Sequence, residues 1–109
     1  MIVAVRQINS IRQLRINVGL EFRLETYDPR RVNLEHELRK LPEFLNIENN
    51  GDLNLTIDGK EIAVTVRVDD AFVYVVQHVS CRETDAILGL LIRKILTLND
   101  HVVVSDFVL

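Results

Sequence analysis

The sequence lacks most of the features that would support a strong functional prediction. Its 109 residues include one cysteine, no tryptophan, two prolines and four glycines. A single cysteine cannot form an internal disulfide bond, and no apolar run approaches the roughly 18 residues that span a membrane. The chain also begins without the basic and apolar segments of a secretory signal. We therefore expect a soluble, cytoplasmic protein with no membrane partner.

Motifs for cofactors and metals are missing as well. The sequence contains neither GxxxxGK nor GxGxxG, which excludes nucleotide binding through a glycine-rich loop. A zincin helix starting at His36-Glu37 would need a second histidine where Lys40 stands. His36 and His101 have no cysteine or carboxylate set at ligand spacing. We expect no cofactor and no metal.

The composition is that of a globular protein, with 48% hydrophobic and 27% charged residues. A chain of this length is near the commonest domain size, so we expect residues 1–109 to form a single compact domain. The formal net charge of −3 disfavours a protein that coats nucleic acid, because such proteins carry a basic surface.

Hydrophobic periodicity predicts two strands and then a helix in the first part of the chain. Residues 2–8 are typical of a short strand, and residues 14–27 alternate apolar with other side chains at the period of a long, half-buried strand. Asp28 followed by Pro29 predicts a helix start, with a helix over residues 29–40 that ends before Pro42. Residues 43–52 have the composition of a loop.

Residues 53–79 predict three strands joined by two tight turns. A type I′ turn at 58–59, Asp-Gly, pairs Leu55 with Ile62, which keeps the apolar residues on one face. A second turn at 69–70 pairs Val66 with Val73 on that same face. The opposite face of these strands is neither plainly core nor plainly solvent-exposed, and it carries Thr65, Arg67, Phe72, Tyr74, Val76 and His78.

From Ser80 the period changes to that of a helix. Ser80 and Glu83 fit a capping box, an apolar face runs to Leu98, and a last strand follows from residue 101. The predicted class is α+β, a mainly antiparallel sheet of five to six strands covered by two helices in the order ββαβββαβ. If residues 61–79 form one bent element, the alternative is a ferredoxin-like βαββαβ order with an extra N-terminal strand.

Cys81 and His78 are the only candidates for catalysis. A thiol at a helix N-terminus beside Arg82 could act as a nucleophile, with His78 as its base. However, no glycine-rich loop surrounds Cys81 to stabilise an oxyanion, and a histidine in an alternating strand should point sideways from the sheet. We expect Cys81 to be structural, and an enzyme is therefore an alternative rather than the main prediction.

Surplus apolar surface favours an interaction module that binds another protein and associates with itself. The predicted surface comprises Phe72, Tyr74, Val76 and Arg67 on the second sheet face and Leu90 outside the apolar arc of the last helix. A homodimer could use this sheet face, the exposed side of the last helix or the terminal strand, which ends without a polar tail.

A nucleic-acid-binding regulatory protein is the first alternative. Phe72 and Tyr74 could stack on bases, with Arg67, Arg15 and Arg23 nearby. The acidic net charge disfavours this role.

Overall fold

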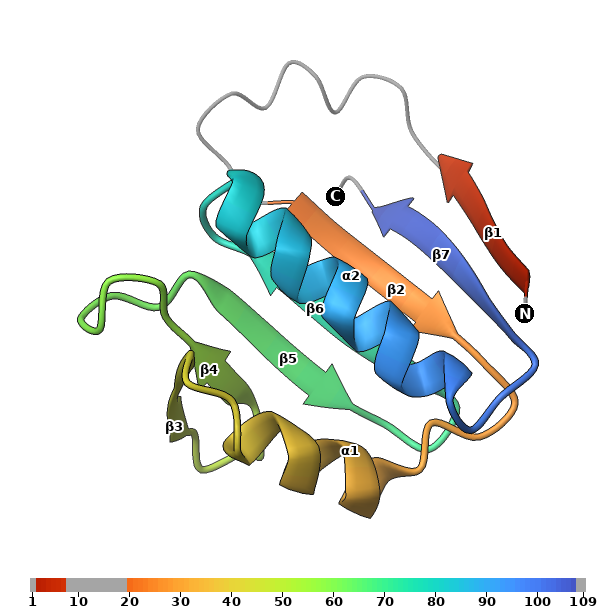
Figure 1. The fold of residues 1–109 in the computed structure, drawn as a ribbon, viewed down its shortest axis with the longest axis horizontal. Helices are drawn as coiled ribbons and strands as arrows, with labels where there is room; N and C mark the ends of the chain where they lie inside the picture. The colour runs from red at the N-terminus through yellow and green to blue at the C-terminus, as the bar shows by residue number, and fades with distance from the viewer. Residues whose placement is uncertain (1, 8–19, 108–109) are drawn as a thin grey trace.

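The computed structural model describes residues 2–7 and 20–107, which form one seven-stranded sheet and two helices (Figure 1). The strands are β1 (Ile2–Gln7), β2 (Leu20–Glu25), β3 (Phe44–Ile47), β4 (Leu53–Leu55), β5 (Val64–Val68), β6 (Phe72–Gln77) and β7 (His101–Phe107). The helices are α1 (Arg31–Arg39) and α2 (Arg82–Leu96). The strand order in the sheet is β1-β7-β2-β6-β5-β4-β3. Six strands pair antiparallel, and β1 joins β7 in parallel, which confirms the predicted α+β class and mainly antiparallel sheet.

The order of elements along the chain agrees with the prediction and adds one short strand. This strand, β3, lies within residues 43–52, which were predicted to be a loop. The ferredoxin-like alternative is wrong, because residues 61–79 contain two separate strands, β5 and β6. A tight turn joins them, in which the Asp69 N–H donates to the Phe72 carbonyl at 2.8 Å. Residues 14–19 of the long predicted strand lie outside the described residues, as do residue 8 and residues 108–109.

Both helices lie on one face of the sheet, with α2 crossing over β2 and β6 and α1 beside β5 and the β3–β4 pair (Figure 1). Alternate residues of the strands point towards these helices, as the period of two requires. The covered face is apolar and closely packed. The apolar strand residues on it that are 0% exposed are Leu24, Leu53, Leu55, Val64, Val66, Val73, Val75 and Val102.

The central strands pair in a register shifted by two residues from the predicted one. Leu55 pairs with Val64 rather than with Ile62, and Val66 pairs with Val75 rather than with Val73. Between β4 and β5 the reason is a wider loop, where the Asp58 carboxylate accepts the backbone N–H groups of residues 60 and 61. These hydrogen bonds hold the pKa of Asp58 below its ordinary value, and the bond from residue 61 has the largest effect. Between β5 and β6 the turn is also wider than predicted, since Val68 pairs with Val73. A shift of two leaves every side chain on its predicted face.

The wider loop removes two predicted core residues from the sheet. Ile57 is 44% exposed and Ile62 is 38% exposed, although both were predicted to face the core. The turn at Asp58 is not of type I′, because Asp58 does not have a positive φ and only Gly59 does, at 82°.

The start of α1 differs from the prediction by two residues. Arg30, in a left-handed conformation with φ of 55°, precedes the helix, and its N–H donates to the Asp28 carboxylate at 3.0 Å. Leu34 and Leu38 are buried against the sheet, while Val32 is 77% exposed. Val32 precedes Leu34 by two residues, which is about 200° around an α-helix, so it lies on the solvent side.

The capping interaction of α2 is shifted by one residue from the prediction. Cys81 is the N-cap, and its backbone N–H donates to Thr84 Oγ1 at 3.0 Å, so the box is formed by Cys81 and Thr84 instead of Ser80 and Glu83. The predicted buried side of the helix is otherwise correct and includes Ile87, Leu91 and Ile95. Leu98 is exposed because the helix ends at Leu96. In the described part of the chain, neither helix is both long and apolar enough to cross a membrane.

The terminal strand β7 lies inside the sheet. It pairs with β1 on one side and with β2 on the other. The prediction that this strand offers a free edge for dimerisation is therefore wrong, because β1 returns from the start of the chain to cover it.

Candidate functional site

We use the name open face for the face of the sheet opposite α1 and α2. Phe72, Tyr74 and Val76 project onto it from β6, and Arg67 projects from β5. The pairing of the two strands places Arg67 opposite Tyr74 and Thr65 opposite Val76. The three β6 side chains are partly buried, and the Arg67 side chain is 55% exposed. The structure thus gathers four of the five predicted surface residues on one face, and their role in binding stays a prediction.

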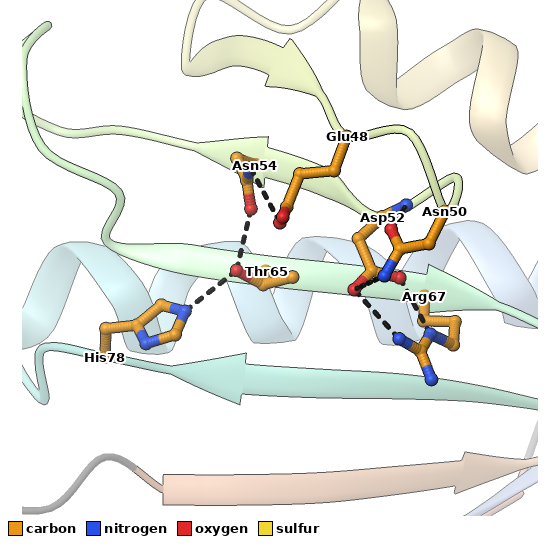
Figure 2. A network of polar contacts seen from close by, with 7 residues as sticks. All are labelled: Glu48, Asn50, Asp52, Asn54, Thr65, Arg67 and His78. Carbon is orange, nitrogen blue, oxygen red and sulfur yellow. Dashed lines mark hydrogen bonds and ion pairs between the residues drawn. The ribbon is translucent and has the colours of Figure 1, made fainter.

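A chain of polar side chains crosses the open face from β4 to the end of β6 (Figure 2). The Asn54 amide nitrogen donates to Asn46 at 2.8 Å and to Glu48 at 3.1 Å. Its carbonyl oxygen accepts the Thr65 hydroxyl at 2.8 Å, and Thr65 Oγ1 lies 2.8 Å from His78 Nε2. Asn54 is only 1% exposed, so these partners replace the water that it would otherwise need.

An ion pair lies beside this chain (Figure 2). Arg67 binds Asp52 through two hydrogen bonds, Nε to Oδ1 at 2.7 Å and a terminal nitrogen to Oδ2 at 3.0 Å. Asn50 fixes the loop by exchanging hydrogen bonds with Asp52. The bond from Arg67 holds the pKa of Asp52 below its ordinary value, and the same pair raises the pKa of Arg67. Such a fork holds both side chains in one orientation.

Tyr74 and Phe72 are held by residues of β2. The Tyr74 hydroxyl donates to the Glu21 carboxylate at 2.8 Å. Burial of the phenol, together with this bond and the negative charge of Glu21, raises the pKa of Tyr74 to about 12. Arg23 lies over the Phe72 ring, 4.2 Å from its centroid, in a cation–π contact. The aromatic side chains of the open face are therefore fixed in place by charged neighbours.

His78 and Cys81, the two candidates for catalysis, have different hydrogen-bond partners in the structure. Thr65 has one hydroxyl proton and donates it to Asn54, so the hydrogen-bond pattern assigns the proton of the His78 contact to Nε2. That nitrogen is thus a donor to Thr65, and the contact holds the ring beside β5. The Cys81 side chain instead bonds to Glu83, which lowers the pKa of Glu83, and its sulfur lies 3.7 Å from Thr84 Oγ1.

Leu90 lies apart from the other predicted surface residues. It belongs to α2, on the helix side of the sheet, and lines a groove of about 570 Å³. The structure therefore separates the predicted surface into the open face and a second region on α2.

The sequence patterns identified three of the seven residues in Figure 2, Thr65, Arg67 and His78, and missed the other four. The alternation of the strands places Thr65 and Asn54 on the open face, and a polar residue between two leucines in LNL is a signal that could have been used. The contribution of Glu48 and Asp52 comes from the turn after β3, and no local pattern predicts that this turn folds back over β5.

Within residues 2–7 and 20–107, no three histidine, cysteine or acidic side chains gather in a way that could hold a metal ion. Comparison with protein-family models, with curated proteins and with solved structures gives no match.

Proposed function

We propose that this protein is a non-catalytic interaction module that associates with itself. We further propose that it binds another protein through its open face. The observation that carries this proposal is the row formed by Phe72, Tyr74 and Val76 at the centre of the sheet. One side of β6 is covered by α2, whereas these three side chains remain partly accessible on the other side. An apolar centre with a polar border is the usual composition of a protein-binding surface.

The polar network supports the same role. Association orders interface side chains, which costs roughly 0.5–1.5 kcal/mol for each flexible one. Arg67, Tyr74 and Thr65 already have fixed partners in the free protein, so little further ordering is needed when a partner docks. Arginine and tyrosine are also the residue types that most often dominate binding energy.

The open face is better suited to a protein than to a nucleic acid. Arg23 already covers the Phe72 ring, which leaves less of that ring for base stacking. Four carboxylates, Glu21, Glu25, Glu48 and Asp52, accompany the two guanidinium groups of Arg23 and Arg67 on or beside this face. A phosphate backbone would be repelled, so we expect a partner with an apolar centre and basic residues around it.

The proposal can be tested with one matched pair of variants. Val76→Lys places a charge in the apolar centre of the open face, opposite Glu21, which can receive the new ammonium group. Val32→Lys makes the same change on α1, where the native side chain is already 77% exposed. Both variants and the wild type are used as bait for affinity capture from the native source, after their melting curves have been shown to agree.

The expected result is a protein retained by the wild type and by Val32→Lys but lost from Val76→Lys. Identical sets of retained proteins for all three baits would contradict a role for the open face.

A further inference from the structure

One flank of α2 carries four residues that are spaced symmetrically along the sequence. Glu83, Ala86, Leu90 and Arg93 follow one another at intervals of three, four and three residues, which places them in one stripe along the helix. An acidic residue stands at one end of this stripe and a basic residue at the other, about 15 Å apart at the rise of an α-helix. The two residues between them are apolar, one small and one large.

The same stripe borders the groove beside α2. All four residues line it, and the opposite wall includes Pro42 and Ile57. Ile57 is 44% exposed, and Glu83, Ala86 and Arg93 are exposed as well, whereas Ile87 below them is buried. A side chain added at Gly89 would meet no atom within 4 Å, so the surface of the helix next to the stripe is open. This region leaves apolar surface accessible next to charges of both signs.

We infer that a second copy of this chain covers the stripe, with the two α2 helices packed antiparallel. The two-fold axis between them crosses α2 at the level of residue 88 along the helix. The axis follows from the sequence intervals, since residues 83 and 93 are equally distant from 88, as are residues 86 and 90. Glu83 of each copy then faces Arg93 of the other, and Ala86 faces Leu90. The two-fold axis forms each of these contacts twice.

Charge pairing, matching of side-chain size and the helix dipoles all favour a second copy as the partner of the stripe. The order acidic, small, large, basic becomes complementary to itself when one helix is reversed, which pairs opposite charges and places a large side chain against a small one. The antiparallel arrangement also sets the positive end of each helix dipole beside the negative end of the other. In a parallel arrangement, by contrast, like charges would face each other.

This inference rests on the self-association within the proposed function and assigns it a surface. The stripe and the open face lie on opposite sides of the sheet, so a dimer formed through α2 leaves the open face accessible to another protein. The two surfaces can therefore be tested separately.

The test is a charge exchange followed by analytical ultracentrifugation over a range of concentrations. Glu83→Arg and Arg93→Glu should each weaken the dimer of 12.6 kDa chains about tenfold or more, because each creates two pairs of like charges. The double variant Glu83→Arg/Arg93→Glu restores opposite charges in both pairs and should return to within about threefold of the wild type.

The double variant also separates an interface from a role within the helix. Glu83 is in the first turn of α2 and Arg93 is in the last, and each charge interacts favourably with the helix dipole at its end. Exchanging both residues therefore removes two favourable interactions inside one chain. A purely internal role would make the double variant worse than either single variant. Arg39→Glu, in the last turn of α1, is the control for loss of a dipole interaction elsewhere and should leave the dimer unchanged.

A wild type that stays monomeric at high micromolar concentration would overturn the inference and leave the stripe to a different protein. A dimer that survives both single exchanges, or that is split by Val76→Lys instead, would show that the copies meet elsewhere. Loss of a captured partner from Val76→Lys with an intact dimer would uphold both proposals.

Discussion

The two faces of the sheet are built from the same strands and differ in burial and in side-chain chemistry. On β6, Val75 points to the covered face and is 0% exposed, while its neighbour Val76 points to the open face and stays partly accessible. On β5, Val66 is buried under the helices, while Arg67 on the other side forms an ion pair. The comparison shows that a single alternating pattern can supply a buried core on one face and partly accessible aromatic and charged side chains on the other.

The two faces also contribute different amounts to the free energy of unfolding. Burying one aliphatic side chain of the covered face contributes roughly 1.5–3 kcal/mol, and the strands bury many of them. A hydrogen bond of the open face contributes a net of about 0.5–1.5 kcal/mol. The covered face therefore provides most of the stability, and the open-face network mainly fixes the directions of its side chains.

The sharpest test of this comparison uses adjacent residues with the same side chain. Val75→Ala should lower the free energy of unfolding by about 2–3 kcal/mol, because it removes two methyl groups from a closed environment. Val76→Ala should cost less than about 1 kcal/mol, because solvent already reaches this site. Urea denaturation at one fixed protein concentration measures both, and equal costs would mean that the open face is covered in solution.

A smaller effect is expected from the ion pair. Asp52→Asn should lower stability at neutral pH by on the order of 1 kcal/mol, since Arg67 is largely exposed and solvent weakens the pair. The folded pKa of Asp52 is depressed, so its contribution is complete above the ordinary value of 3.8 and is lost as the pH falls through the folded value. Unfolding curves of the two proteins should therefore converge in acid.

Asp70→Asn, in the exposed turn between β5 and β6, is the control for loss of a surface carboxylate. A difference between wild type and Asp52→Asn that is constant from neutral to strongly acidic pH would argue against the ion pair as its source.

The smallest effect concerns Tyr74. Tyr74→Phe should cost about 0.5–1 kcal/mol at neutral pH through loss of the bond to Glu21. The folded pKa of about 12 lies above the ordinary value of 10.0, so the folded protein holds the phenol proton more tightly. This contribution is present below pH 10 and is lost as the pH rises through about 12.

Tyrosinate absorbance in a Tyr27→Phe background isolates this group, because the chain has two tyrosines. A midpoint near 10 in the folded protein would show that Tyr74 is solvated and not bound to Glu21.

The sequence by itself determined which residues share a face. The predicted pairing of Leu55 with Ile62 was wrong by two residues, yet Leu53, Leu55, Val64 and Val66 still lie together, because side chains alternate with a period of two. The same periodicity separated Arg67, Tyr74 and Val76 from the core, and the spacing of Ile87, Leu91 and Ile95 gave the buried side of α2. These features depend only on neighbours within a few residues.

The tertiary structure alone decided how distant segments meet. It placed β7 between β1 and β2, folded the turn with Asp52 over Arg67, and paired Tyr74 with Glu21, 53 residues earlier in the chain. It also set both helices on one face and thereby made the other face open. Such contacts depend on the packing of the whole chain, because the free energy that closes a long loop comes from burial elsewhere and leaves no local pattern.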